Sequence, residues 1–571
     1  DGSAKLAAVA AKAGEATRRV VVRPDALRQR LLGFGGSMTE SSAQLIHCSP
    51  DRERILDALF LPPPAGVGMS CLRLCVGASD FATEYYNYQP TPDSCFDMSR
   101  ENAVLLPVLR SAKARNPALT LVASPWTAPE WMKENGKANG GRLSQSKHNA
   151  YACYLMRYLS GMEELGFPIA ALALQNECWH SADSAPTMLL DPEETKSLAG
   201  VLVPMLRQNG IATQILAHDH NYDLAEKATA LMRAAGNLVD GTAWHAYGGH
   251  PRVLEDFVKE FPQHEVFFFE QTAHGQSNFG GDLGWALEHL YFGSLQHGSR
   301  SVLHWNVALD PRNGPRLEST CPTCRGLVTV DPAGGFQEEP EYTLLGHFAG
   351  VLPSGSVMVD VENVDGVEVV AGISPSGAMG MVLRSRDAGG AVELVVGEEP
   401  GGVVELPENS VVSVVLPSGG WRVPRPAPPF LAQPVQSPVR FPSRFYLKSF
   451  HGTWVAAHGE SSDAYQSDVN EPGAWELWRA VPAGNRLFVL QSLAHSTFLH
   501  QGGSRSALQH LACFASALRL VVRVTAEAEG RIQVNLVADQ GSLGMPEKRG
   551  DGPYLKQDNG SGWESFWVVA G

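Results

Sequence analysis

The sequence predicts an α/β protein built on a (β/α)8 TIM barrel, with an attached antiparallel β-sandwich and a C-terminal all-β β-trefoil. Three observations predict this fold. Eight short apolar runs alternate with helical patterns, valine-rich runs follow them, and the C-terminal part contains an internal repeat. The chain has 571 residues, of which 44% are hydrophobic, so it is long enough to bury the cores of several domains.

The eight apolar runs define the predicted barrel. They are continuous rather than alternating, which is typical of parallel strands that are covered on both faces. A helix-like stretch such as 147–165 separates neighbouring runs, with apolar residues three and four positions apart. Eight such units favour a closed barrel over an open sheet. The runs are 33–36, 71–77, 119–126, 169–177, 213–219, 241–247, 265–271 and 301–309.

The pattern changes twice after the barrel. Valine-rich runs separated by Gly and Pro, such as 411–415, predict antiparallel strands. Three β-rich segments then begin at Arg444, Arg486 and Arg531, spaced 42 and 45 residues apart, and a three-fold period favours a trefoil over another kind of barrel. The predicted parts are an N-terminal tail (1–24), the barrel (25–345), the β-sandwich with part of the N-terminal segment (346–425), a Pro-rich linker (426–442) and the trefoil (443–571).

Composition excludes several classes of function. The net charge of −15 makes nucleic acid a poor partner, and the absence of any run of eighteen apolar residues predicts no transmembrane segment. Nine cysteines are too few for a disulfide scaffold. The chain begins at Asp1, and no signal peptide is visible in it. We nevertheless expect a secreted or lumenal, lysosome-like protein, and we expect no cofactor and no metal.

Two glutamates stand where a barrel carries its catalytic groups. Glu177 and Glu270 each follow an apolar run directly, which aims both side chains into the mouth of the barrel. A single glutamate in this position is commonly explained by the favourable N-terminus of the next helix. The pair, beside Asn176, instead favours a glycosidase, in which one carboxyl group donates a proton and the other attacks the sugar. Five tryptophans near strand ends offer flat faces to sugar rings: Trp126, Trp131, Trp179, Trp244 and Trp305.

Two other groups of residues contain possible metal ligands, but neither has the spacing of a metal site. The segment His218–His220 has no second ligand pair at matching spacing, so a polar pocket wall is the better interpretation. Cys321 and Cys324 form a lone CxxC motif without the second pair that zinc normally needs. This motif predicts a small loop closed by a disulfide, or else a pair of free thiols.

Several motifs together resemble glycoside hydrolase family 30. They are GFGGSMTE (33–40), ASPWTAPEWMK (123–133), QNE (175–177), WHAY (244–247) and HWNVALD (304–310). The resemblance covers about residues 30 to 420. The family includes lysosomal glucosylceramidase and microbial β-1,6-glucanases. The resemblance implies a (β/α)8 barrel with an attached β-sandwich, and hydrolysis by double displacement with retention of configuration.

The resemblance also implies roles for individual residues. Glu177 corresponds to the general acid/base and Glu270 to the nucleophile. Asn176 would hydrogen-bond the 2-hydroxyl of the sugar, and Asp80 would hold sugar hydroxyls in the −1 pocket. Arg73 would pair with a catalytic carboxylate and keep it ionised.

The remaining residues carried over by the resemblance line the same pocket. Trp126 would hold sugar hydroxyls together with the aspartate, and Trp305 and Asn306 would line the sugar site. His245 and Tyr247 would orient or hydrogen-bond the nucleophile.

These observations predict a retaining β-glucosidase whose substrate is either glucosylceramide or a β-linked glucan. Two departures from the family pattern weaken ceramide specificity. Cys178 follows the acid/base where proline is usual, which predicts a looser turn, and His304 stands where animal glucosylceramidases have aspartate. A β-xylosidase or β-fucosidase of the same family stays open, as does a non-hydrolytic carbohydrate-binding protein. Exo and endo action are equally open.

The C-terminal repeats resemble β-trefoil modules of the fascin or carbohydrate-binding type. Such a module would tether the enzyme to a glycan and raise the effective substrate concentration. The alternative is a module that only packs on the barrel. The expected partners are therefore a carbohydrate or glycolipid substrate and a glycan bound by the trefoil.

Overall fold

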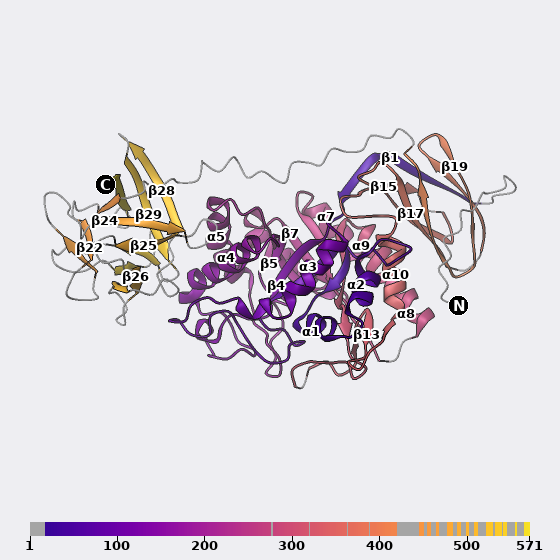
Figure 1. The fold of residues 1–571 in the computed structure, drawn as a ribbon. Helices are drawn as coiled ribbons and strands as arrows, with labels where there is room; N and C mark the ends of the chain where they lie inside the picture. Colours follow the sequence, from indigo (N-terminus) through magenta and orange to yellow (C-terminus); the bar gives the residue numbers. More distant parts are fainter. Residues whose placement is uncertain are drawn as a thin grey trace.

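The computed structural model describes residues 18–418 except 276–277, 319, 363 and 387–388. Beyond residue 418 it describes only the backbone of strands β21 (Phe445–Ser449) to β32 (Ser565–Ala570). The predicted linker and the predicted three-fold arrangement of 443–571 lie outside the described residues. In Figure 1 the barrel and a separate β-sheet domain make up the part of the chain between residues 18 and 418.

Eight parallel strands close into a barrel in the order β10-β2-β3-β4-β5-β6-β7-β8. This confirms the predicted TIM barrel. The strands are β2 (Gly33–Ser37), β3 (Cys71–Val76), β4 (Thr120–Pro125), β5 (Ile169–Ala173), β6 (Gln214–Asn221), β7 (Gly241–His245), β8 (Glu265–Glu270) and β10 (Ser299–Asn306). Side chains such as Val122, Leu216 and Phe267 fill its interior, while a larger core lies between strands and helices, so both faces are buried.

Helices cover the outside of the barrel (Figure 1). They are α1 (Glu40–Cys48), α2 (Arg52–Phe60), α3 (Leu105–Arg115), α4 (His148–Glu164), α5 (Pro192–Gln208), α6 (Ala225–Ala235), α7 (Val253–Glu260), α8 (Phe279–Ala286), α9 (Phe292–Leu295) and α10 (Pro340–Ala349). Asp191 begins α5 with a capping box to Glu194, and proline follows at the first helical position. Among the described residues, no helix is both long and apolar enough to cross a membrane.

The second domain is one seven-stranded sheet in the order β19-β18-β1-β15-β16-β17-β20. Its strands are β1 (Arg18–Arg30), β15 (Val357–Glu362), β16 (Val367–Ile373), β17 (Met379–Ser385), β18 (Gly390–Val396), β19 (Glu399–Leu406) and β20 (Val411–Leu416). Valines from both halves of the sheet form a core of their own. The predicted antiparallel pattern is wrong at one place, because β1 and β18 run parallel.

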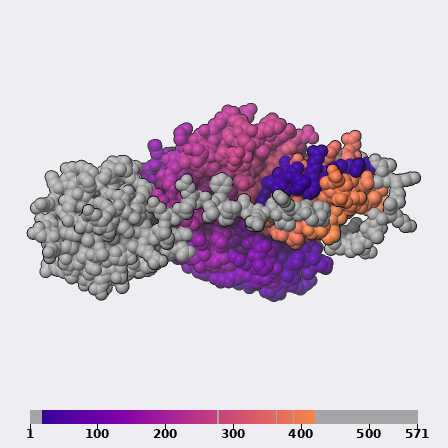
Figure 2. Space-filling view, turned by 90° about the horizontal axis from the view of Figure 1, so that it is seen from above, coloured from indigo at the N-terminus to yellow at the C-terminus, as the bar shows by residue number. Residues whose placement is uncertain are grey.

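The strand β1 corrects the predicted N-terminal tail. Residues 18–24 belong to this strand, and residues 1–17 lie outside the described residues. Val20 and Val22 are fully buried in the core of the sheet, while arginines on either side reach solvent. Figure 2 shows the indigo atoms of this N-terminal segment beside orange atoms of residues near position 400. The segment was predicted as a tail because its strand partners lie more than 300 residues away in the sequence.

Candidate active site

The two glutamates meet at the C-terminal ends of the barrel strands. Glu270 is the last residue of β8, and Glu177 lies shortly after β5. One carboxylate oxygen of each glutamate and one ring nitrogen of His245 all lie within 4.8 Å of one another. Parallel strands in a barrel bring these ends to one face, which explains how residues 93 positions apart share a site.

Arg73 links most of the polar groups in the site. It extends from β3 with no exposed surface, and its Nη1 contacts Glu270 Oε2. Its Nη2 donates to Asn176 Oδ1 at 2.6 Å and to Asp219 Oδ2 at 2.9 Å, and its Nε donates to Ser124 Oγ at 3.1 Å. A buried guanidinium is stable only when paired in this way. Burial lowers the pKa of Arg73, but the two carboxylates outweigh it, so the side chain stays charged.

Glu270 accepts hydrogen bonds from two donors. One is Arg73, and the other is the Tyr247 hydroxyl at 2.9 Å from Oε1. Burial raises the pKa of Glu270 above its usual value, and the positive charges of His245 and Arg73 offset only part of this effect. The carboxylate is therefore placed in a dry environment with two donors, of which one carries a permanent positive charge.

Glu177 has a titratable partner instead. His245 Nδ1 lies 3.5 Å from Glu177 Oε1, and the other ring nitrogen lies 2.9 Å from Asp219 Oδ1. His220 Nδ1 lies 4.0 Å from the same glutamate oxygen, but it accepts a hydrogen bond from the backbone of Asn221 and so donates nothing to Glu177. His245 is thus the imidazole that can exchange a proton with Glu177.

The charges around His245 decide where this proton rests. Burial lowers the pKa of His245, but Glu270, Asp219 and Glu177 outweigh burial and raise it to about 9. Burial raises the pKa of Glu177, but the positive charge of the nearby His245 outweighs burial and holds the pKa well below its usual value. In the ligand-free site the pair therefore holds one proton, which rests on the imidazole.

The backbone around Glu177 takes an unusual conformation. Glu177, His218 and Asp219 have φ angles of 48°, 70° and 48°, in the left-handed region that non-glycine residues seldom adopt. The Glu177 amide donates to the Asp219 carbonyl at 2.8 Å. Cys178 Sγ donates to the His218 carbonyl at 3.0 Å, so the turn that we expected to be loose has a contact of its own. Such strain persists where surrounding contacts hold it, commonly at functional sites.

Aromatic rings and one carboxyl group form the wall of the site. Trp126 and Trp305 stack with centroids 5.0 Å apart, and Arg73 lies 4.7 Å from the centroid of Trp126. Asp80 Oδ1 is buried and has no hydrogen-bond partner within the described part of the chain. Burial raises the pKa of Asp80 to about 8, and the negative charges of Glu270 and Glu177 add to that effect. An acceptor of this kind suits a sugar hydroxyl.

Not every predicted residue lies where the sequence placed it. Tyr247 hydrogen-bonds Glu270, whereas His245 contacts Asp219 and Glu177 rather than orienting the nucleophile as the resemblance implied. Trp244, one of the five tryptophans expected to face sugar, is fully buried in the outer core, where it stacks on Tyr222.

Other predicted residues are tied to neighbouring elements. The Trp131 indole donates to the Gln89 carbonyl at 2.9 Å. Asn306 is the last residue of β10 and is buried. Its Oδ1 accepts a hydrogen bond at 2.8 Å from the hydroxyl of Thr39, which lies just after β2. Trp179 is half-buried, with the ammonium group of Lys227 5.1 Å from its centroid.

The sequence reasoning missed two members of the network. Asp219 received only the role of a pocket wall, and Ser124 received none, yet Ser124 Oγ donates to Asp219 Oδ2 at 2.7 Å. The signal for Asp219 was its place at the end of an apolar run. Its partners come from β3, β4 and β7, so their identity depends on the order of strands in the barrel.

A short loop closes one side of the site. Cys321 and Cys324 form a disulfide, and strand β12 (Cys324–Arg325) pairs with β9 (Ala273–His274), which follows the strand of Glu270. The Leu317 amide in the same loop donates to the Asp80 carbonyl at 2.9 Å. Because both sulfurs are bonded to each other, they are not thiolate ligands for a metal, although His274 lies beside them.

The donor atoms of Glu177, His245 and Glu270 are close enough together to surround a cation. Arg73 already brings a permanent positive charge to Glu270, and the second carboxylate shares a proton with the imidazole. A cation would meet repulsion from both. The donor set therefore suits proton transfer better than metal binding.

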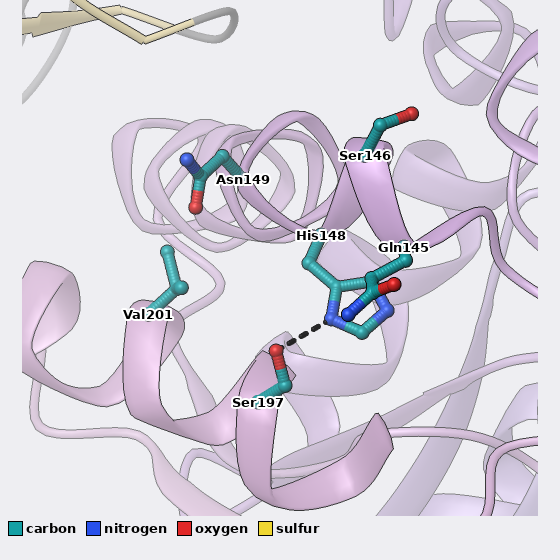
Figure 3. A pocket seen from close by; sticks show the side chains of 6 residues that line it. All are labelled: Gln145, Ser146, His148, Asn149, Ser197 and Val201. Carbon is teal, nitrogen blue, oxygen red and sulfur yellow. Dashed lines mark hydrogen bonds between the residues drawn. The ribbon is translucent and has the colours of Figure 1, made fainter. Parts of the chain in front are cut away.

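A cavity of about 360 Å³ lies away from the barrel mouth, in the helical layer (Figure 3). It is lined by residues around the start of α4 and by Ser197 and Val201 of α5. His148 Nδ1 lies 2.7 Å from Ser197 Oγ across it. Its lining is polar and carries no carboxylate, so it does not compete with the barrel mouth as the candidate catalytic site.

The closed barrel and the paired carboxylates at its mouth define a glycoside hydrolase. The chain belongs to glycosyl hydrolase family 30, because the family's TIM-barrel domain matches residues 31–352.

Relatives within the family have different substrates. An endo-1,6-β-D-glucanase of Neurospora crassa is 28% identical over 422 residues, which cover 70% of this chain and 87% of that protein. The lysosomal acid glucosylceramidase of Mus musculus is 26% identical over 404 residues, covering 65% and 77%. A solved endo-β1,6-glucanase structure superposes with a TM-score of 0.66 at 25% identity, covering 70% of this chain and 94% of that one.

Proposed function

We propose that this protein hydrolyses β-1,6-linked glucan by double displacement, with retention of the anomeric configuration. The observation that carries the mechanism is the spacing of the carboxylates, which bring oxygens within 4.8 Å of each other. Retaining glycosidases hold their carboxyl groups about 5–5.5 Å apart, whereas inverting enzymes leave room for a water molecule with about 6.5–9.5 Å.

In the first step Glu270 attacks the anomeric carbon and the glycosidic oxygen leaves with a proton. Arg73 and Tyr247 donate to Glu270 and favour its ionised form against the effect of burial. His245 supplies its proton to Glu177 across 3.5 Å, and Glu177 passes it to the leaving oxygen, which leaves Glu177 ionised and His245 neutral. The covalent glycosyl-enzyme ester at Glu270 carries no charge on the carboxyl group.

In the second step Glu177 acts as a base. Esterification of Glu270 removes the negative charge that most strongly raises the pKa of His245, so the imidazole stays neutral after it has given up its proton. Glu177 takes a proton from water, and the resulting hydroxide equivalent attacks the anomeric carbon and releases Glu270 as a carboxylate. The proton returns to the pair shared with His245, and the cycle closes without a cofactor.

The wall residues would hold the sugar during both steps. Asn176, already bonded to Arg73, would accept or donate at the 2-hydroxyl, where the interaction strengthens as the transition state forms. Asp80 would accept from sugar hydroxyls through its unpartnered oxygen. Trp126 and Trp305 would lie against the apolar face of the ring, and Asn306 would line the wall behind them.

Two features favour a glucan over glucosylceramide. Relatives named as endo-1,6-β-glucanases match 68–70% of this chain at 26–28% identity, and the superposed solved structure is that of an endo-β1,6-glucanase. His304, where animal glucosylceramidases have aspartate, is buried and donates to or accepts from the Tyr291 hydroxyl at 3.0 Å, so it serves the barrel wall and not a lipid.

A substrate panel tests the proposal. It contains β-1,6-glucan, an aryl β-glucoside, an aryl β-xyloside, an aryl β-fucoside and glucosylceramide, each with the Glu177→Gln and Glu270→Gln variants. Release of gluco-oligosaccharides from the glucan with retained β-configuration, lost in Glu270→Gln, supports the proposal. Faster turnover of the xyloside or fucoside favours those sibling activities. Binding without turnover of any substrate would favour the carbohydrate-binding alternative and refute the proposal.

Two further expectations belong to this function. We propose a secreted or lumenal location, which the Cys321–Cys324 disulfide supports, because such bonds persist in oxidising compartments.

We also propose that the C-terminal module docks the enzyme on a glycan. Deletion of residues 426–571 tests this, with weaker retention on insoluble glucan as the expected result and unchanged turnover of an aryl glucoside as its control.

A further inference from the structure

A second cavity, of about 300 Å³, lies behind the strand that carries Glu270. Its lining comes from the segment after β8, from α8, from the end of β10 and from α10. The residues that carry the argument are Gln271, Asp282, Trp285, His304 and Glu341.

This cavity is distinct from the catalytic site, although it lies beside it in the sequence. Successive side chains of a strand point to opposite faces. Glu270 and Trp305 face the catalytic mouth, whereas their neighbours Gln271 and His304 line the cavity. The barrel wall therefore separates the two spaces by the thickness of one strand.

The lining offers an aromatic face. Trp285 is 39% exposed, which is high for an indole that lines a cavity. His289 stacks on one face of the ring with centroids 4.4 Å apart and planes inclined by 8°. His289 covers one face of the indole, so a ligand in the cavity would contact the part of the ring that stays exposed. Sugar rings present apolar C–H faces that pack on such a surface.

The lining also offers fixed hydrogen-bond acceptors. Arg325 donates to Asp282 Oδ2 at 2.8 Å and to both oxygens of Glu341 at 3.0 and 3.1 Å, which holds the two carboxylates in place. Gln271 is only 7% exposed, and its Oε1 has no hydrogen-bond partner in the described ranges of the chain. A buried acceptor without a partner is costly unless a ligand supplies the donor.

We propose that this cavity is a second sugar-binding site, which takes one glucosyl residue of the glucan outside the catalytic pocket. The inference rests on the proposed function, because it assumes a polymeric glucoside as the substrate. The combination of an aromatic face, oriented carboxylates and an amide is the combination that hydroxyl-rich neutral ligands require. Arg325 neutralises part of the acidic charge, which disfavours a metal cation as the occupant.

The variant Trp285→Ala tests the site. The expected result is a KM for β-1,6-glucan that rises about 3- to 10-fold, the usual range for loss of one aromatic contact. Turnover of a small aryl β-glucoside is expected to stay within twofold of the unmutated protein, because the aryl substrate fills only the catalytic pocket. Trp285→Tyr is expected to restore most of the affinity for the glucan.

The matched control is Phe279→Ala. Phe279 lies on the same helix and is 50% exposed, but it is not part of the cavity lining. An unchanged glucan KM in Trp285→Ala would overturn the inference, as would equal losses on glucan and aryl glucoside, since those indicate a structural role. Equal effects of Trp285→Ala and Phe279→Ala would also overturn it.

A binding measurement separates failure of this inference from failure of the proposed function. If the unmutated protein does not cleave β-1,6-glucan, the proposed function fails. Affinity electrophoresis in gels that contain β-1,6-glucan then compares Glu270→Gln with Glu270→Gln/Trp285→Ala in the full chain. Retardation that is reduced by the second substitution supports the sugar site on its own. Identical retardation of the two proteins, or no retardation of either, overturns it.

Discussion

Glu270 and Glu177 are the same residue type in the same barrel mouth, but their neighbours differ in kind. Glu270 contacts Arg73 and Tyr247, and the guanidinium keeps its charge throughout the accessible pH range. Glu177 faces His245, whose charge changes with pH. A permanent charge suits a group that must stay ionised before it attacks. A titratable partner suits a group that must gain and lose a proton in each cycle.

The geometry of the two sides differs as well. Glu270 is the last residue of β8, whereas Glu177 lies outside any strand in a left-handed backbone conformation and its amide donates to the end of β6. The pairing of β8 with β7 positions the nucleophile. The acid/base side depends on side-chain contacts of Asp219, Cys178 and His245. We therefore expect substitutions on the two sides to have different kinetic signatures.

The largest expected effect is on the nucleophile side. Glu270→Gln removes the attacking carboxylate, and kcat for every hydrolysed substrate is expected to fall by at least about 10⁴-fold. Steady-state assays with an aryl β-glucoside measure the loss, and an unchanged thermal midpoint serves as the folding control. Residual activity above about 1% would show that Glu270 is not the nucleophile. The contrast between the roles of Glu270 and Glu177 would then fail.

The next effect depends on the leaving group. Glu177→Gln removes the proton donor, so kcat/KM is expected to fall by about 10²- to 10⁴-fold for leaving groups that need a proton. A dinitrophenyl glucoside leaves without protonation, and its kcat/KM is expected to change far less. Azide, which needs no base, is expected to speed the second step. Equal losses across a series of leaving groups would contradict the acid role.

The third effect concerns pH. The negative charge of Asp219 stabilises the protonated imidazole, so Asp219→Asn lowers the pKa of His245 from its value of about 9. The shared proton is then lost at lower pH, and the alkaline limb of kcat/KM is expected to move down by roughly one unit. The acid limb, which reports Glu270, should move less. Ser124→Ala removes a neutral contact to Asp219 and is the matched control. An unmoved alkaline limb would contradict the shared proton.

The smallest effect concerns the loop beside both carboxylates. Replacing Cys321 and Cys324 by serine opens a ring of four residues, which is expected to lower the free energy of unfolding by at most about 2 kcal/mol. The loop also holds the Asp80 backbone, so KM for the glucan is expected to rise by roughly threefold with kcat nearly unchanged. Reduction of the unmutated protein with a dithiol should give the same shift. A fall in kcat alone would contradict this role.

Much of the barrel could be predicted because buried parallel strands leave a strong local signal. The run 213–219 corresponds to β6 (Gln214–Asn221), and the run 301–309 overlaps β10 (Ser299–Asn306). The helix expected within 147–165 spans His148–Glu164. The glutamates themselves were predictable from the same signal, because they stand where the apolar runs end and because the motifs around them resemble a family.

Other features had no local signal. Strand β1 pairs with residues 357–362 and 392–396, and nothing near residue 20 encodes those partners. Trp244 and Trp305 look alike in sequence, but β7 directs one indole into the outer core and β10 directs the other to the sugar wall. The family resemblance implied that His245 would orient or hydrogen-bond Glu270, and only the packed barrel shows it beside Glu177 and Asp219.

The sequence by itself determined the repeated strand–helix pattern, the family and the two carboxylates, because each depends on residues that are close together in the chain. The tertiary structure alone decided which groups lie close enough to share a proton, which tryptophans face the site, and how Arg73 reaches Asp219 across the two strands between them. Hydrogen bonds and charge interactions act over a few ångströms. They are therefore fixed by which strands become neighbours when the barrel closes.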